Sequence, residues 1–218
     1  MALFIILDKE ALMAKIDYKK ELRHFYQASV KEVGIVDVPQ MNFLMIDGEG
    51  NPNTSKPFQE AVEVLYSLAY SLKFMVKKGT KGIDYGVMPL EGLWWVDDMT
   101  QFSIEKKDEW KWTLMIMQPE LITRELFAEA VKEVRKKKNP VALTNIRFES
   151  FSEGKAAQIM YIGPFAEEGP TIEKVHSFIT ENGYTLSGKH HEIYISDMRK
   201  TAPEKLKTII RQPMEKQG

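Results

Sequence analysis

Cysteine is absent from the 218 residues of the sequence. Its absence excludes disulfide bonds, thiolate nucleophiles and metal sites with cysteine ligands, and it is typical of a protein from a reducing compartment. An excess of basic charge is also missing, because 30 Lys and Arg residues are balanced by 31 Asp and Glu residues. Without that excess there is no electrostatic drive for sequence-independent binding to DNA or RNA, so we expect no nucleic acid as a direct partner.

Long hydrophobic runs are missing as well. The apolar run at the start, residues 2–7, is far shorter than the ~20 residues that span a bilayer, and it lacks the basic segment and cleavage site of a signal peptide. We therefore expect a cytoplasmic protein that does not enter a membrane. The segment before Met13 fits no later pattern: either Met13 is the true initiator, or the segment is a short strand at a sheet edge.

Several motifs of catalysis and ligand binding are incomplete. The turn Asp47–Gly50 lacks the Gly-Lys-Ser/Thr of a phosphate loop, and no Ser lies in a Gly-x-Ser-x-Gly elbow. His190 and His191 are adjacent, and neighbours in a strand point to opposite faces, so the two cannot easily ligate one ion. We therefore expect no metal site, no cofactor and no hydrolase of the Ser-His-Asp type.

What the sequence does contain is a weak internal repeat of the order strand, helix, strand. In the first copy, the strand Phe43–Ile46 leads into a helix with apolar residues at 3.6-residue spacing and then into a strand that ends at 92–97. In the second copy, the strand Gln158–Ile162 leads into a shorter helix and a strand that ends at 192–197. With 44% hydrophobic residues to form a core, the repeat predicts one α+β domain.

Further elements surround the two copies. Between them lie a strand over Trp110–Pro119, a helix over 123–138 and a strand near 146–151, and an amphipathic helix is expected over 18–30. We assign residues 1–38 to an N-terminal extension that includes this helix. The remainder, 39–218, is one domain with two pseudo-repeats at about 41–119 and 141–213.

Aromatic residues and one carboxylate converge on the strands that end the two copies. Alternate residues of a strand share a face, so Glu192 and Tyr194 project together from the face opposite Ile193. The repeat places Trp94 at the position that matches Tyr194, and Gly92 at the position that matches Glu192. Both copies therefore offer a ring to one surface, and only the second offers a carboxylate.

Other rings are close in the sequence: Trp110 and Trp112 share a face of their strand, and Tyr85 precedes the Trp94 strand. Large rings around a few polar groups are the usual composition of a ligand pocket. We therefore predict that a small hydrophobic or aromatic molecule is bound by Trp94, Trp110, Trp112 and Tyr85. Packing of the same rings in an ordinary core is the alternative. Among rings, the pKa of Glu192 would rise, and the group would act as a general base or pair with a cation; exposure at a sheet edge is its alternative.

These residues resemble a known family. The ending Gly183-Tyr184, Gly188-Lys-His-His-Glu-Ile-Tyr-Ile-Ser-Asp and Pro203-Glu-Lys-Leu-Lys-Thr-Ile-Ile-Arg-Gln-Pro is similar to that of GyrI-like small-molecule-binding proteins. The runs Met88-Pro-Leu-Glu-Gly-Leu-Trp-Trp and Trp110-Lys-Trp-Thr resemble the stand-alone branch of that family. The resemblance implies duplicated β-α-β-β units that form a mostly antiparallel sheet, with helices on one face and a ligand cleft between the halves.

The resemblance also implies functions. In multidrug-sensing regulators of this family, a buried Glu at the position resembling Glu192 meets cationic aromatic drugs, and the stand-alone branch includes hydrolases of cyclopropanoid DNA-alkylating toxins. As a hydrolase, the chain would use Glu192 to activate water, Tyr194 to hydrogen-bond the substrate carbonyl, and Trp94, Trp110 and Trp112 to stack on the substrate.

Two other functions are open at this point. The chain can instead sequester or sense planar or cationic drugs without catalysis, because the same pocket suits a base and a counter-ion. A contact with gyrase is a third hypothesis, which rests on the family name. In each case we expect a monomer or weak dimer.

Overall fold

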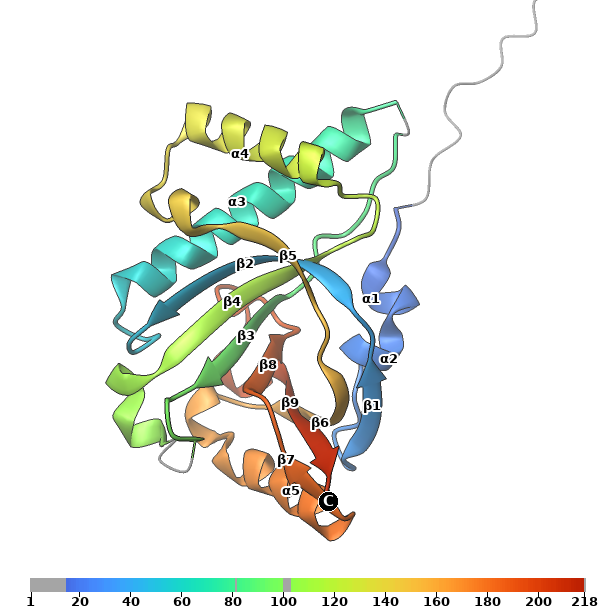
Figure 1. Ribbon diagram of the computed structural model, residues 1–218, viewed down its shortest axis with the longest axis vertical. Coiled ribbons are helices and arrows are strands. Elements are labelled where there is room, and N and C mark those ends of the chain that lie inside the picture. Colours follow the sequence, from blue (N-terminus) through green and yellow to red (C-terminus); the bar gives the residue numbers. More distant parts are fainter. Residues whose placement is uncertain (1–14, 81, 100–102, 218) are drawn as a thin grey trace, which may run out of the picture.

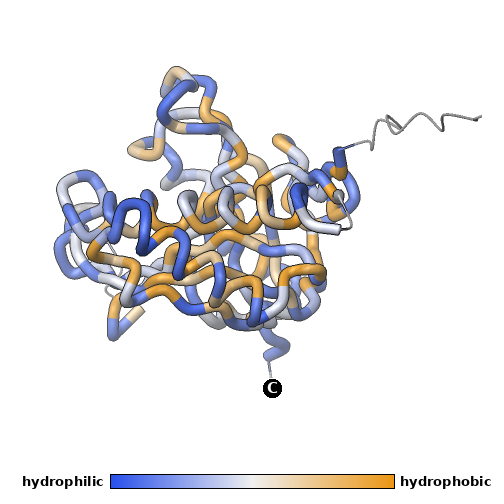
Figure 2. The backbone as a smooth tube through the Cα atoms, turned by 90° about the horizontal axis from the view of Figure 1, so that it is seen from above, coloured by the Kyte–Doolittle hydropathy of each residue, from blue (hydrophilic) through white to orange (hydrophobic). Residues whose placement is uncertain are grey.

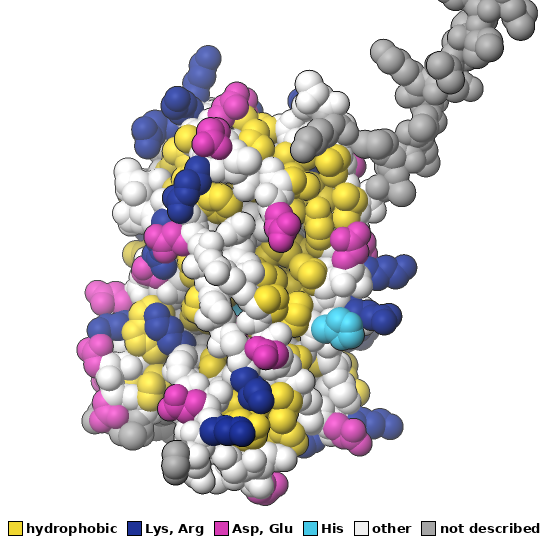
Figure 3. All heavy atoms as spheres, turned by 45° about the vertical axis from the view of Figure 1, so that its right-hand side comes forward, with side chains coloured by type: hydrophobic (Ala, Val, Ile, Leu, Met, Phe, Trp, Pro, Cys, Tyr) yellow, Lys and Arg dark blue, Asp and Glu magenta, His cyan; other side chains and the backbone are white. Residues whose placement is uncertain are grey.

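The computed structural model describes residues 15–80, 82–99 and 103–217. Met13 lies outside these ranges, so the two interpretations of the first residues stay open. Within the ranges, every helix is too short or too polar to cross a membrane. On the face shown in Figure 3, Lys and Arg side chains lie among Asp and Glu side chains, in keeping with the balanced composition.

A nine-stranded sheet, antiparallel at every pairing, forms the centre of the molecule (Figure 1). Its order is β1-β6-β9-β8-β3-β4-β2-β5, and β7 pairs with β9. The strands are β1 (Gly34–Val38), β2 (Met41–Glu49), β3 (Leu90–Trp95), β4 (Lys111–Gln118), β5 (Arg147–Phe151), β6 (Gly154–Ile162), β7 (Tyr184–Leu186), β8 (His190–Tyr194) and β9 (Lys207–Lys216). The helices are α1 (Tyr18–Glu21), α2 (Arg23–Tyr26), α3 (Lys56–Lys78), α4 (Arg124–Lys137) and α5 (Gly169–Glu181), with short 3₁₀ helices at 104–109, 141–145, 165–167 and 203–205.

The strand order confirms the duplicated α+β fold. Read outward from the centre, one half runs β3-β4-β2 and the other runs β8-β9-β6, so β2-α3-β3-β4 and β6-α5-β8-β9 are equivalent units. The halves join where β3 pairs with β8, and there Gly92 pairs directly with Glu192. A pseudo-two-fold axis through this pair makes Trp94 the equivalent of Tyr194, as the repeat predicted.

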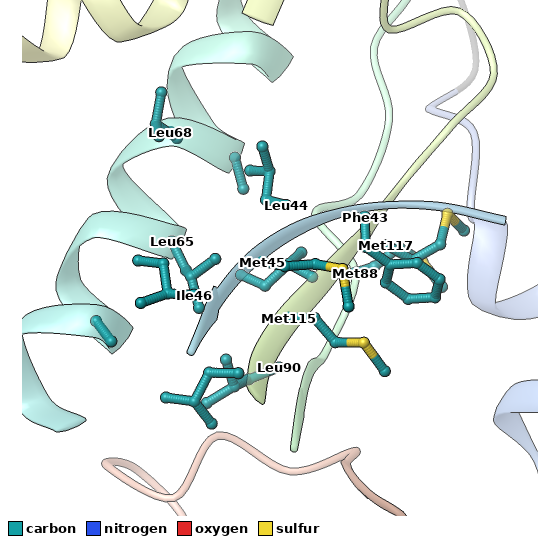
Figure 4. Packing of buried hydrophobic residues seen from close by; sticks show 14 of the residues in the cluster. Phe43, Leu44, Met45, Ile46, Leu65, Leu68, Met88, Leu90, Met115 and Met117 are labelled. Carbon is teal, nitrogen blue, oxygen red and sulfur yellow. The ribbon is translucent and has the colours of Figure 1, made fainter. Parts of the chain in front are cut away.

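Helices α3 and α5 cover the same face of the sheet. The Ser55 side chain caps α3 by accepting a hydrogen bond from the Phe58 backbone N–H. Leu65 and Leu68 of α3 then lie toward Leu44 and Ile46 of β2 (Figure 4). Seen from above, hydrophobic segments of the backbone run through the middle of the molecule (Figure 2). Burial of such side chains stabilises the fold by about 1.5–3 kcal/mol each.

Helix α5 packs on the other half through a smaller cluster of Val175, Ile179, Ile159 and Ile210. Ile210 pairs with Glu192, so this cluster lies on the face to which Glu192 points. Helix α4 lies on the outer side of α3 (Figure 1). The first turns of α3 and α5 therefore flank the β3–β8 junction, where the halves meet.

The N-terminal segment differs from the prediction of one amphipathic helix over 18–30. The structure has two single turns, and the chain is extended from Gln27 (φ −136°, ψ 130°). The helix ends early because the Ser29 carbonyl accepts a hydrogen bond from the Met160 backbone N–H at 2.8 Å, which ties this segment to β6. The strand after it, β1, then pairs with β6 along its whole length.

A buried charge network fastens α2 to the opposite face of the sheet. His191 lies between two carboxylates: its Nδ1 is 2.8 Å from Glu153 Oε1 and its Nε2 is 3.0 Å from Glu91 Oε2. The Tyr26 hydroxyl of α2 donates to Glu91 at 2.8 Å, and Arg211 donates to Glu153 at 2.9 Å. Two positive groups thus balance two carboxylates, which is the condition under which charges can be buried.

This network makes stability depend on pH. Burial alone would lower the pKa of His191, but Glu153 and then Glu91 outweigh it and raise the pKa from 6.5 to about 9. The stabilisation is therefore complete below pH 6.5 and is lost as the pH rises through about 9. We expect the free energy of unfolding, measured by urea denaturation, to fall over this interval, and to fall much less in His191→Gln. A wild-type stability that is flat across the interval would contradict the ion pairing.

Candidate functional site

A cavity of about 270 Å³ opens at the β3–β8 junction, between the first turns of α3 and α5. Its walls are largely aromatic, with a few polar groups among the rings. The aromatic lining is Phe58, Trp94, Trp110, Phe165 and Tyr194, and the polar lining is Asn53, Lys107, Glu168 and Glu192. Large rings around few polar groups are typical of sites for small organic molecules.

The rings that line the cavity pack in two groups, which together form an aromatic cage. The Trp94 ring is 5.9 Å from Phe58 at an interplanar angle of 25°, and 5.4 Å from Trp110 at 63°. Across the cavity, Phe165 meets Tyr194 edge to face at 5.6 Å. Such pairs fix each other's orientation, so the cage presents ring faces and edges in a preformed arrangement.

Two glycines make room for the tryptophans. A Cβ at Gly92 would lie 2.8 Å from Trp94 Nε1, and a Cβ at Gly48 would lie 2.2 Å from the Trp112 ring. Each indole therefore lies over a backbone position that has no side chain. At the pseudo-two-fold axis, the glycine that replaces a second carboxylate is thus the residue that admits the Trp94 ring.

Gly92→Ala is expected to displace the Trp94 ring and to weaken ligand binding at least about tenfold, because the ring loses its place against Trp110. Gly34→Ala in β1 is the matched control, since a Cβ there would meet no described atom within 4 Å. Isothermal titration with a planar cationic dye measures both variants. Equal affinity of Gly92→Ala and wild type would show that the Trp94 position is not part of the binding surface.

The carboxylate of Glu192 lies at the floor of the cavity in the middle of the sheet, and it is 6% exposed. The Tyr194 hydroxyl donates to Glu192 Oε2 at 2.7 Å, and His190 Nε2 lies 3.3 Å from Glu192 Oε1. The alternation that places these three side chains together places His191 on the opposite face. The alternative that Glu192 is exposed at a sheet edge is therefore wrong.

A second carboxyl group, Glu168, meets Glu192 from the residue before α5. Burial, then the charge of Glu192, raises the pKa of Glu168 to about 10, so it is a neutral acid that donates a hydrogen bond to Glu192. Burial would also raise the pKa of Glu192, but His190, Tyr194 and Glu168 outweigh it and lower the pKa. The predicted rise of the Glu192 pKa is thus wrong, and the rise belongs to its neighbour.

One proton shared by two buried carboxyl groups gives the cavity an acid and a base side by side. Glu192 can accept a proton from water or hold a cation, and Glu168 can donate a proton to an oxygen atom. At the mouth, the Lys107 ammonium lies 5.3 Å from the centre of the Trp110 ring. Among the described residues, no group of three or more His, Asp and Glu side chains is arranged to hold a metal ion.

The structure brings together four of the six predicted site residues, Trp94, Trp110, Glu192 and Tyr194. Trp112 lies behind the cage, where it supports Phe58 edge to face at 5.3 Å. The prediction that Tyr85 lines the ligand site is wrong. Its ring is buried against Tyr18 at 6.0 Å, at the N-terminal segment and away from the cavity. It precedes β3 in the sequence, but the loop before the strand runs to Ile16, with which Tyr85 forms a bridge.

Sequence reasoning missed Glu168, Phe58, Phe165 and Lys107. Phe58 follows the periodicity of a core helix, and Phe165 and Lys107 belong to 3₁₀ helices that show no period. A signal was present only for Glu168, which stands directly before Gly169-Pro170, a typical helix start.

Comparisons with known proteins identify the family of the chain. Residues 31–214 match the family model of the GyrI-like small molecule binding domain. The crystal structure of an uncharacterized conserved protein from Listeria innocua is 40% identical, with a TM-score of 0.85 over 92% of this chain and 100% of that chain. A structure described as a hydrolase from Listeria innocua is also 40% identical, with the same coverage and a TM-score of 0.80.

More distantly, the EcmrR C-terminal domain is 14% identical, with a TM-score of 0.52 over 85% of this chain and 98% of that chain, and this likeness concerns the fold alone. A search of curated proteins found no match. The family model covers most of the chain, including both pseudo-repeats and every residue of the aromatic cage. The chain therefore belongs to the GyrI-like family of small-molecule-binding domains.

Proposed function

We propose that this chain binds planar, hydrophobic or cationic aromatic molecules in the cage and hydrolyses those that carry an activated cyclopropane ring, as cyclopropanoid DNA-alkylating toxins do. The observation that carries the proposal is the pair Glu168 and Glu192, an acid and a base that share one proton in a cavity lined by rings. The relative described as a hydrolase, at 40% identity, supports enzymatic activity.

The proposed reaction adds one water molecule across a carbon–carbon bond of the strained ring. Water attacks the ring methylene carbon and Glu192 takes its proton. The carbon–carbon bond breaks, its electron pair passes through the conjugated system to the carbonyl oxygen, and Glu168 protonates that oxygen. The proton on Glu192 then passes to Glu168 across their hydrogen bond, which restores the starting state.

Each side chain has a defined part in this scheme. Tyr194 donates to Glu192 and so holds the base in place. Once Glu192 has taken the proton of water it is no longer charged, and Glu168 can then donate its own proton to the substrate carbonyl. Trp94, Trp110 and Phe58 stack on the flat substrate and exclude bulk water. Good positioning of water and substrate lowers the activation free energy by several kcal/mol. This is sufficient for an electrophile whose ring is already strained.

Incubation with a cyclopropane-bearing conjugated dienone, followed by mass spectrometry, tests the proposal. We expect product that has gained the mass of one water at a rate proportional to protein concentration. A rate of water addition equal to that in protein-free buffer would contradict catalysis.

Sequestration is the second candidate function, and the charge of Glu192 within aromatic walls favours it for cationic ligands. In that case the ligand would bind tightly and be recovered unchanged after the protein is denatured. The same mass measurement, made on the bound fraction, separates the two functions.

A further inference from the structure

A second cavity, of about 710 Å³, lies along α5 beside the cage. Its walls come from α5, β7, β8 and β9, and they include Ile172, His176, Leu186, His190 and Gln212. Of these elements, α5 and β7 lie at the lower end of the molecule in Figure 1, below β8 in the centre of the sheet. The functional scheme above uses none of this space.

The two cavities share a wall at Gly169, the first residue of α5. A Cβ built on Gly169 would meet no described atom within 4 Å, so no described side chain fills the space above this residue. The floor is continuous as well, because Glu192 of the first cavity and His190 of the second lie on one face of β8 with 3.3 Å between their polar atoms. Two residues of a strand span about 7 Å, which is the offset between the two floors.

The described lining of the second cavity is mostly apolar or neutral, with one carboxylate, that of the exposed residue Glu173. Ile172 and Leu186 are apolar, and burial, then the charge of His190, lowers the pKa of His176, so its imidazole is neutral. His176 donates a hydrogen bond to the Gln212 side chain, and its buried Nε2 atom has no partner among the described residues. In this tautomer Nε2 is an acceptor, so it requires an N–H or O–H donor.

We propose that the two cavities form one bent site for an elongated ligand. A planar head lies among the rings at Glu192, and a tail passes over Gly169 and donates a hydrogen bond to His176. The proposal rests on the binding function proposed above and adds the shape of the ligand: a flat apolar or cationic head with an uncharged tail, at least about 7 Å long, that carries an N–H or O–H group.

Three probes test it by isothermal titration: a planar acridine dye, the same dye with a glycylglycine amide tail, and the same dye with a fully N-methylated tail. Two extended residues span about 7 Å, so the tail reaches the second cavity. We expect the glycylglycine tail to tighten binding at least about tenfold, and the methylated tail, which lacks N–H donors, to give a smaller gain.

Gly169→Leu places a side chain in the passage, and Gly169→Ala is its control. Any side chain before Pro170 disfavours helical backbone, so both variants share that cost and differ in volume. Gly169→Leu is expected to abolish the gain in affinity from the tail, whereas Gly169→Ala retains it. Because Gly169 lines both cavities, the gain of each variant is measured relative to its own affinity for the bare dye. His176→Phe is expected to remove the difference between the two tails.

Equal binding of tailed and bare dye by the wild type would overturn the bent site while the binding function stands. Equal losses for both probes in Gly169→Leu, without losses in Gly169→Ala, would also overturn it, because the leucine would then act on the cage. Absence of binding by the bare dye to wild type would instead overturn the proposed binding function, and this inference with it.

Discussion

Glu192→Gln is expected to lower the rate of ring opening by about 10²–10⁴-fold, the range that a positioned general base contributes. The amide is close in size to the carboxylate, and it cannot accept the proton of the attacking water. It also removes the charge that keeps Glu168 protonated and ready to donate. Initial rates from chromatographic product analysis, at saturating substrate, measure the effect.

The control is Glu181→Gln, which removes an exposed carboxylate at the end of α5. Its rate should equal that of wild type, and circular dichroism should show that both variants retain the fold. If Glu192→Gln turns over substrate at the wild-type rate with its fold intact, Glu192 is not the base, and the proposed mechanism is wrong.

Arg211→Met is expected to destabilise the fold by about 3–5 kcal/mol, the cost of a buried charge left without its partner. Arg211 is 1% exposed, and it holds Glu153 at 2.9 Å and Gln158 Oε1 at 2.9 Å. Without the guanidinium, Glu153 keeps only His191, and burial, which raises the pKa of Glu153, is opposed by one cation instead of two. Urea denaturation monitored by tryptophan fluorescence measures the loss.

Arg199→Met makes the same chemical change at an exposed ion pair with Asp197, which should cost less than about 1 kcal/mol. Both variants replace an arginine of an ion pair with methionine, so the difference between their losses of stability measures the effect of burial. Similar losses in both would mean that the network does not hold α2 to the sheet.

Periodicity was sufficient to predict what strands and helices do to neighbouring side chains. Alternation along β8 correctly separates Glu192 and Tyr194 from His191, and the repeat correctly relates Trp94 to Tyr194. Helix spacing predicted α3, α4 and α5, because their apolar stripes are long and regular. These are properties of a single element or of two similar ones.

What the sequence could not predict depends on contacts between distant segments. The pKa order of the two carboxyl groups follows from Glu168, which meets Glu192 only when the start of α5 folds against β8. Proximity in the chain predicted Tyr85 beside Trp94, but the loop between α3 and β3 pairs with Ile16 instead. The early end of the N-terminal helix likewise follows from a backbone bond to β6.

The pairing of Gly92 with Glu192 has a consequence for how such a site can arise. In a homodimer of two identical halves, the residue on the symmetry axis faces its own copy. Two glutamates there would repel each other, and two glycines would leave the axis without an acid. When the halves are joined in one polypeptide, the two positions no longer have to be identical. Gly92 can then leave room for the Trp94 indole while Glu192 supplies the charge.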